Sequence, residues 1–109
     1  MKKIILLLLA FIFFIGCNKE SELEMILTKN NYIIVDVRTE EEYNESHIKK
    51  AINIPYDEMD DKVNLDKTKT ILVYCKSGKR SSIAYNKLKS LGYDVKDLGA
   101  FDNINLEKE

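Results

Sequence analysis

The sequence is poor in the residue types that build disulfide frameworks and metal sites. Its 109 residues include only two cysteines, Cys17 and Cys75, and one histidine, His47. Two cysteines that lie far apart, without a C-x-x-C pair, exclude the dithiol motif of thiol–disulfide enzymes. A lone histidine is weak evidence for catalysis, and we expect His47 to be a structural turn residue. We therefore expect no bound metal and no other cofactor.

The chain also lacks a region dominated by charge of one sign. Lysine and arginine total 17 residues against 18 aspartates and glutamates, so the formal net charge is -1. No basic stripe alternates with aromatic residues, which argues against a nucleic-acid-binding surface. The charges are mixed along the chain, as on an ordinary solvated surface. With no internal repeat and no low-complexity linker, the length fits one small domain, which we expect to be monomeric.

The N-terminus carries a long apolar run. Met1-Lys2-Lys3 is followed by 12 apolar residues, Ile4 to Ile15. A membrane-spanning helix needs about 20 residues, whereas this length and the positive flank fit the core of an export signal. The run ends in F-I-G-Cys17, which resembles the bacterial lipobox, where the cysteine is lipidated and becomes the new N-terminus. The alternative is an uncleaved N-terminal anchor, and both place the rest of the chain outside the cytoplasm.

The lipobox implies three segments. Residues 1–16 are the signal peptide, residues 17–20 are the lipidated N-terminus and a short tether, and residues 21–109 are the folded domain. Cleavage removes Lys2 and Lys3 and no acid, which leaves 15 basic residues against 18 acidic ones, a net charge of -3. We expect lipid on Cys17 to anchor the protein to the extracytoplasmic side of a bacterial membrane. Cys75 is then the only free thiol, a liability in an oxidising compartment unless its chemistry is needed.

Strand-like and helix-like segments alternate after the tether. The alternation predicts helices over 21–29, 40–46 and 79–91, strands over 32–37, 51–54, 70–74 and 94–98, and short helical turns over 56–62 and 101–106. That order is typical of an α/β fold, in which a mainly parallel central sheet is flanked by helices. The apolar run at 32–37 fits a strand covered on both faces.

Two of the predicted helices carry more detailed signals. Ser21 and Glu24 have the spacing of a capping box, with Ser21 as the N-cap. In the helix over 79–91, four apolar residues fall on one face, with Gly92 as a left-handed cap. These four residues are Ile83, Ala84, Leu88 and Leu91.

Cys75 follows the strand over 70–74 and opens a short loop before a predicted helix. A thiol at this place meets unpaired backbone N–H groups and the positive end of a helix dipole, and both stabilise the reactive thiolate. The loop adds three positive side chains, Lys76, Lys79 and Arg80. Asp36 ends a second strand, and sites in parallel sheets form beyond the carboxyl ends of the strands. The sequence thus places Asp36 and Cys75 at the same edge of the sheet.

Three blocks of sequence surround these residues. They read D-V-R at 36–38, E-Y at 42–43, H-I at 47–48 and A-I-N-I-P at 51–55, then V-Y-C-K-S-G-K-R-S at 73–81, then L-G-Y at 91–93 and L-G at 98–99. In order and spacing the blocks resemble the rhodanese family, and the resemblance extends over residues 22–104. One departure is Ala100, which stands where a second glycine is common. The resemblance implies a small, single-domain rhodanese-like fold.

The resemblance also implies a thiosulfate sulfurtransferase. Cys75 would take a sulfane sulfur from thiosulfate or a polysulfide, become a persulfide, and pass the sulfur to a thiol or to cyanide. Arg80 would hold both the loop and the anionic donor, while Asp36 and Arg38 would support the loop, with Arg38 able to pair with Glu42. The residues implied in substrate binding are those of the loop: Lys76, Ser77, Gly78, Lys79 and Arg80.

Two other functions remain open. The first is a phosphatase or an arsenate reductase on the same fold, but those enzymes have a longer loop between Cys and Arg, suited to a tetrahedral oxyanion. Here four residues separate Cys75 from Arg80, and the smaller loop suits a single sulfur atom. The second is a non-catalytic sulfur-carrier or binding module, which would retain the fold without needing the nucleophile.

Overall fold

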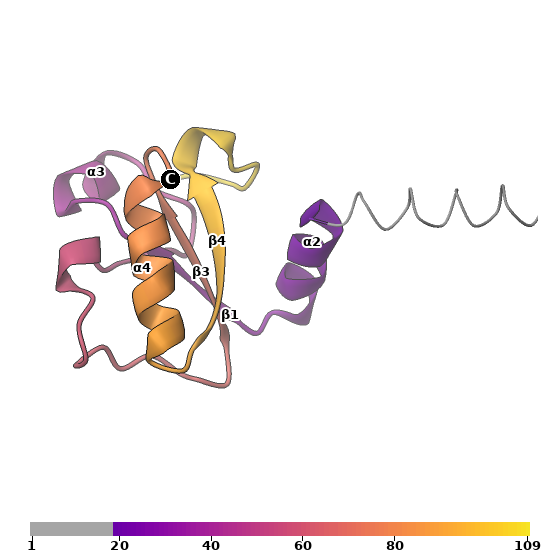
Figure 1. Cartoon of the computed structure of the whole chain (residues 1–109). Coiled ribbons are helices and arrows are strands. Elements are labelled where there is room, and N and C mark those ends of the chain that lie inside the picture. Colours follow the sequence, from indigo (N-terminus) through magenta and orange to yellow (C-terminus); the bar gives the residue numbers. More distant parts are fainter. Residues whose placement is uncertain (1–18) are drawn as a thin grey trace, which may run out of the picture. The chain divides into compact units, whose positions relative to one another are not determined.

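The computed structural model describes residues 19–109 of the chain (Figure 1). The predicted signal peptide over 1–16 and the predicted lipid site Cys17 lie outside the described residues. Helix α2 (Lys19–Lys29) belongs to one compact unit, and residues 31–109 form another. Across residues 19–109, no helix combines the length and the apolar character that crossing a bilayer requires.

The unit of residues 31–109 is built on a four-stranded parallel sheet. Its strands are β1 (Tyr32–Asp36), β2 (Ile52–Asn53), β3 (Thr70–Cys75) and β4 (Asp94–Ala100), in the spatial order β2-β1-β3-β4. Each neighbouring pair is parallel. The central strands β1 and β3 are apolar runs, and β3 is buried from Ile71 onward, as expected for strands covered on both faces. The predicted α/β fold with a mainly parallel sheet is therefore confirmed.

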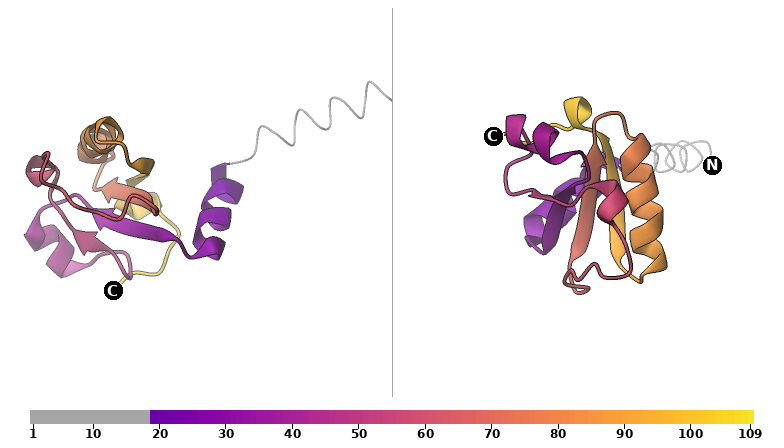
Figure 2. Two further views of the ribbon diagram at one scale, coloured as in Figure 1. Left: turned by 90° about the horizontal axis from the view of Figure 1, so that it is seen from below. Right: turned by 90° about the vertical axis from the view of Figure 1, so that its left-hand side faces the viewer.

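Helices cover both faces of this sheet. Helix α4 (Lys79–Ser90) packs on β3 and β4 and contacts the 3₁₀ turn η1 (Tyr56–Glu58). Figure 2 shows α4 and η1 on one face and α3 (Glu40–Glu45) on the other. A second 3₁₀ turn, η2 (Phe101–Asn103), follows β4. Both 3₁₀ turns are shorter than the helical turns predicted over 56–62 and 101–106.

The ladder between β3 and β4 contains a bulge near its carboxyl end. Tyr74 pairs with Gly99 because β4 contributes one extra residue at this point. Gly99 has a φ of +81°, a left-handed conformation that favours glycine. Beyond the bulge, β4 continues to Ala100, which pairs with Cys75, so the strand is longer than the predicted 94–98. The bulge also brings Gly99 close to Gly78, where an added Cβ would lie 3.8 Å from the Gly99 Cα.

The capping box predicted at Ser21 is wrong, because α2 already includes Lys19 and Ser21 lies inside the helix. Lysine and glutamate are good helix formers, which allows the helix to extend on the N-terminal side of the serine. The same spacing forms a capping box at the start of α3 instead. There the Glu42 N–H donates to Thr39 Oγ1 at 3.2 Å, and the Thr39 N–H donates to Glu42 Oε1 at 3.1 Å. This box fixes the position of the Glu42 carboxylate.

Helix α4 buries a face that includes a polar residue. Ser81, Ala84 and Leu88 are its buried residues. The prediction that Ile83 shares this face is wrong, since its side chain is 48% exposed and lies about 100° around the helix from Ala84. The prediction for Gly92 is confirmed by its φ of +92°. The burial of Ser81 places its hydroxyl beside Cys75 at the end of β3.

Candidate active site

Cys75 is the last residue of β3 and is fully buried. The chain leaves the strand, turns through residues 76–78 and enters α4 at Lys79. Gly78 makes this turn possible, because its φ of +95° lies in the left-handed region. Its N–H donates to Cys75 Sγ at 2.9 Å. The loop therefore folds back on the sulfur and presents backbone donors to it.

Hydrogen bonds oppose the effect of burial on the Cys75 thiol. Burial disfavours the thiolate and by itself raises the pKa of Cys75. The Ser81 hydroxyl and the backbone N–H groups of Ser81, Gly78 and Ser77 act in the opposite direction. Together they outweigh burial, so the pKa of Cys75 lies below the ordinary value of a cysteine thiol. A lowered pKa enlarges the thiolate fraction at neutral pH, which is the form that reacts as a nucleophile.

Ser81 is the residue of this site that the sequence reasoning missed. Its Oγ lies 3.5 Å from Cys75 Sγ and 3.1 Å from the Gly78 carbonyl oxygen. A signal was available, because Ser81 precedes Ala84 by three positions and Leu88 by seven. Helical spacing alone therefore places it on the buried face. A buried hydroxyl needs hydrogen-bond partners, and the thiol at the end of the preceding strand is one of them.

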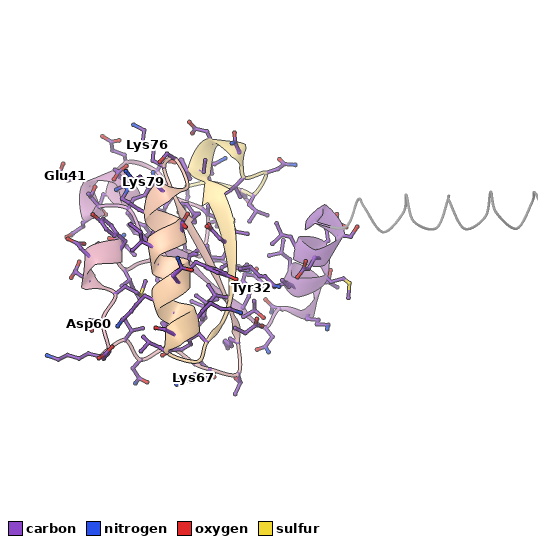
Figure 3. The ribbon with its side chains drawn as sticks, viewed as in Figure 1. Tyr32, Glu41, Asp60, Lys67, Lys76 and Lys79 are labelled. Atoms are coloured by element: carbon purple, nitrogen blue, oxygen red, sulfur yellow. The ribbon has the colours of Figure 1, made fainter. Side chains whose placement is uncertain are left out.

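Lys76 and Lys79 are both exposed, and Figure 3 shows them beside the loop at the N-terminal end of α4. Over residues 21–109, neither lysine takes part in an ion pair. Within that range, no carboxylate lies within salt-bridge distance of either charge. Ser77 is exposed as well, so the outer side of the loop is accessible while the sulfur beneath it is buried.

Arg80 is engaged by a carboxylate. Its Nη1 donates to Glu42 Oε1 at 2.7 Å and its Nη2 donates to Glu42 Oε2 at 3.1 Å. The Arg80 hydrogen bond lowers the pKa of Glu42 to about 2, and Glu42 in turn raises the pKa of Arg80. The predicted pairing of Glu42 with Arg38 is wrong, because Arg38 lies on Asp36 instead. Arg80 therefore holds the loop against α3, and its contact with a donor stays a prediction.

Asp36 and Arg38 form a buried ion pair beside β3. Arg38 Nε donates to Asp36 Oδ1 at 2.9 Å, and Arg38 Nη2 donates to Asp36 Oδ2 at 2.7 Å. The same Nη2 donates to the Ser46 carbonyl at 2.6 Å. The Tyr74 hydroxyl donates to Asp36 Oδ2 at 2.8 Å and accepts the Ile48 N–H at 3.0 Å. The network thus reaches the residue that immediately precedes the thiol.

Two aromatic rings cover the Arg38 guanidinium. Its Cζ lies 4.3 Å from the centroid of the Phe101 ring and 5.6 Å from that of Tyr74, a cation–π geometry. The Phe101 and Tyr74 rings stack at 5.7 Å. Burial raises the pKa of Tyr74, and its hydrogen bond to Asp36 adds to the increase. Tyr74 therefore remains a neutral donor to the Asp36 carboxylate.

His47 makes structural contacts. Its ring stacks on Tyr43 with centroids 3.8 Å apart, its Nδ1 lies 2.8 Å from the Tyr43 carbonyl, and its Nε2 lies 3.3 Å from Glu109 Oε1. The backbones of His47 and Glu109 exchange hydrogen bonds of 2.8 Å. Across residues 21–109, no three His, Cys, Asp or Glu side chains are arranged to hold a metal ion.

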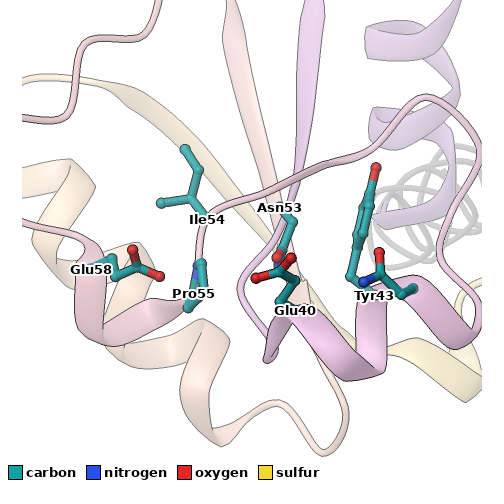
Figure 4. A pocket seen from close by; sticks show the side chains of 7 residues that line it. Glu40, Tyr43, Asn53, Ile54, Pro55 and Glu58 are labelled. Carbon is teal, nitrogen blue, oxygen red and sulfur yellow. The ribbon is translucent and has the colours of Figure 1, made fainter.

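A shallow hollow of about 520 Å³ lies between α3 and the segment after β2, and Figure 4 shows it from close by. No residue of the loop from Cys75 to Arg80 lines it. Two of its lining residues are acidic, Glu40 and Glu58. Its lining residues are Glu40, Tyr43, Asn44, Asn53, Ile54, Pro55 and Glu58.

A buried, hydrogen-bonded cysteine at the carboxyl edge of a small parallel sheet is the arrangement that the sequence blocks implied. The family model of the rhodanese-like domain matches residues 19–105. The chain belongs to the rhodanese-like domain family. A solved structure described as a rhodanese with anions from E. coli has a similar fold, with a TM-score of 0.66 and 34% identity, over 72% of this chain and 96% of that one. The fold prediction is thereby confirmed at the level of the family.

Two relatives of this chain are proteins of different kinds. The chain is 36% identical over 78 residues to the thiosulfate sulfurtransferase PspE of Escherichia coli, across 68% of this chain and 75% of that protein. It is 40% identical over 79 residues to a probable molybdopterin-synthase adenylyltransferase of Porphyra purpurea, across 68% of this chain. The chain spans only 21% of the length of the second protein. The relatives of this rhodanese-like chain therefore differ widely in length and in the activities that their names describe.

Proposed function

We propose that this protein is a thiosulfate sulfurtransferase that works through a persulfide on Cys75. The Cys75 thiolate attacks the outer sulfur of thiosulfate, a bond forms between the two sulfurs, and sulfite leaves with the electron pair of the broken S–S bond. A thiol or cyanide then attacks the outer sulfur of the persulfide and regenerates the thiolate. A polysulfide serves as a donor in the same way.

The single observation that carries this proposal is the hydrogen bonding around a buried Cys75. The Gly78 N–H lies 2.9 Å from Sγ, and the hydrogen bonds to the sulfur lower its pKa in spite of burial. A thiolate is a strong sulfur nucleophile and also a good leaving group, and both halves of the proposed reaction need these properties. The likeness to a thiosulfate sulfurtransferase supports thiosulfate as the donor.

The remaining loop residues have supporting roles in the proposal. Lys76 and Lys79 attract the dianionic donor to the loop, since their charges are exposed and have no ion-pair partner across residues 21–109. Ser77 and Gly78 supply backbone N–H groups, and Arg80 holds the loop through Glu42. Asp36 and Arg38 brace the strand that carries the thiol, through Tyr74.

Intact-mass spectrometry of the full chain tests the proposal. After incubation with thiosulfate, the protein gains the mass of one sulfur atom, and cyanide removes it with formation of thiocyanate. Cys75→Ser abolishes the gain, whereas the matched control Cys17→Ser, which replaces the other cysteine, keeps it. Normal sulfur loading in the Cys75→Ser variant would contradict the assignment of the nucleophile.

A phosphatase assay on the same protein distinguishes the proposed sulfur transfer from a phosphatase activity on the same fold. We expect negligible hydrolysis of p-nitrophenyl phosphate, because only four residues lie between Cys75 and Arg80. Rapid hydrolysis that Cys75→Ser eliminates would favour the phosphatase. Absence of sulfur transfer and of hydrolysis would favour the non-catalytic module.

We also propose that lipid on Cys17 anchors the protein to the extracytoplasmic side of a bacterial membrane. The support comes from the sequence alone. Two lysines near the N-terminus precede 12 apolar residues, and the run ends in F-I-G-C. Metabolic labelling with a fatty-acid analogue in a bacterial host should mark the wild type and spare Cys17→Ala. Release of an unlabelled wild-type protein that starts beyond Cys17 would contradict the proposal.

A further inference from the structure

The Ser81 hydroxyl lies between two groups that compete for its single proton. Its Oγ is 3.5 Å from Cys75 Sγ and 3.1 Å from the carbonyl oxygen of Gly78, and the residue is fully buried. A hydroxyl has one O–H donor and two acceptor lone pairs. It can therefore donate to the carbonyl or to the sulfur, but not fully to both.

The protonation state of Cys75 decides which partner receives that proton. A neutral thiol donates its S–H to Ser81 Oγ, and the hydroxyl donates to the Gly78 carbonyl. A thiolate has no proton to give and only accepts, so the hydroxyl donates to the sulfur instead. The hydroxyl changes its acceptor by rotating about the Cβ–Oγ bond of Ser81. No heavy atom has to move, because both distances already allow a hydrogen bond. The Gly78 N–H stays on the sulfur in both states.

We propose that Ser81 is a further catalytic residue, whose hydroxyl turns from the Gly78 carbonyl to Cys75 Sγ whenever that sulfur carries negative charge. The inference rests on the proposed sulfur transfer and names one more group that acts on the reacting atom. Hydrogen bonds to a charged partner are stronger than those to a neutral one. The hydroxyl therefore stabilises the thiolate more than it stabilises either the thiol or the persulfide.

The two halves of the reaction use this donation differently. When the thiolate attacks thiosulfate, the charge leaves Sγ for the outer sulfur, and the hydroxyl returns to the Gly78 carbonyl. Donation has enlarged the thiolate fraction but has made each thiolate less nucleophilic, so the two effects oppose each other. When cyanide attacks the outer sulfur, the bond between the two sulfurs breaks and Sγ departs with the electron pair. Donation then stabilises the leaving thiolate without an opposing effect.

The experiment compares the isosteric variants Ser81→Thr and Ser81→Val in the full chain, with Ser81→Ala as the smallest truncation. Ser82→Ala is the matched control, because Ser82 is the exposed neighbour on the same helix. The first measurement is the rate of Cys75 alkylation by iodoacetamide against pH. We expect the thiolate to appear at higher pH in the Val and Ala variants and at the wild-type pH in the Thr and Ser82 variants.

The charge of Arg80 also acts on the sulfur. Lys76 lies in the loop that follows Cys75, and Lys79 is the first residue of α4. None of the four substitutions changes these groups, so a shift of the alkylation profile reports the hydroxyl. Equal profiles in the Thr and Val variants would overturn the proposal. Because alkylation needs no sulfur donor, this result stands even where thiosulfate is not a substrate and the proposed function fails.

The second measurement separates the half-reactions by quenched mass spectrometry. It is made at a pH where all variants are fully ionised. Relative to Ser81→Thr, we expect Ser81→Val to release sulfur to cyanide about 10-fold more slowly, while its loading from thiosulfate is slowed much less. Equal slowing of both halves would indicate a purely structural role and would also overturn the proposal.

Discussion

Arg80 and Glu42 form a two-point ion pair, with Nη1–Oε1 at 2.7 Å and Nη2–Oε2 at 3.1 Å. The pair joins the start of α4, where the loop ends, to α3 on the opposite face of the sheet. Glu42 is held at the same time by the capping box with Thr39. The loop over Cys75 is therefore tied to an independently fixed carboxylate.

A double-mutant cycle on Arg80 and Glu42 should show that the pair holds the loop. We expect Arg80→Ala and Glu42→Gln each to slow sulfur loading, and the double variant to be little worse than either, because both remove the same contact. Arg80→Lys should recover only part of the activity, since lysine lacks the planar fork. Strictly additive losses, measured as kcat/KM for thiosulfate, would mean that Arg80 acts on the donor independently of Glu42.

The low pKa of Glu42 predicts an acid-sensitive contribution to stability. Its folded-state pKa of about 2 lies below the ordinary 4.5. The contribution is therefore fully present above about pH 4.5 and is lost as the pH falls toward 2. Urea unfolding should show Glu42→Gln less stable than the wild type by about 1–2 kcal/mol at pH 6, after allowance for partial exposure. The difference should narrow at lower pH, and a difference that is constant from pH 6 to pH 2.5 would contradict this account.

The buried network around Asp36 should be the most sensitive part of the fold. Asp36→Asn leaves the Arg38 charge without its buried partner, and we expect a loss of about 3–5 kcal/mol in the free energy of unfolding. Tyr74→Phe removes one donor to Asp36 and the acceptor of the Ile48 N–H, for which we expect about 1–3 kcal/mol. Tyr85→Phe is the matched control and should change little. Comparable losses for the two tyrosine variants in urea unfolding would be evidence against the network.

The exposed lysines of the loop should attract the donor. Lys76→Ala with Lys79→Ala should lower kcat/KM for thiosulfate by about 10-fold at low ionic strength, mainly through KM. Salt should reduce the wild-type rate and affect the double variant less, because ions screen exposed charges. Lys50→Ala with Lys62→Ala changes the net charge equally and is the control. If both double variants lose the same activity, net charge matters and the position of the lysines does not.

Local features of the sequence predict the order of strands and helices. They also predict that Cys75 lies between a strand and a helix. Apolar runs predict the central strands β1 and β3, and the spacing around Cys75 predicts a loop between a strand and a helix. These features are determined within a few neighbouring residues, so the sequence alone suffices to predict them. The parallel sheet then follows from the alternation of elements, because parallel strands need crossover connections.

Tertiary structure alone decided which side chains meet. Glu42 was free by sequence to pair with Arg38 four positions before it, yet it pairs with Arg80, which lies 38 positions away. The spacing along the chain favoured a pair between Glu42 and Arg38. In the folded protein Arg38 is buried against Asp36 and the Phe101 ring, so Glu42 pairs with Arg80. Ser81 reaches the thiol for a similar reason, since the packing of α4 on β3 turns that face of the helix toward Cys75. Ion-pair partners and buried polar contacts depend on distances across the sheet, which residue spacing along the chain does not specify.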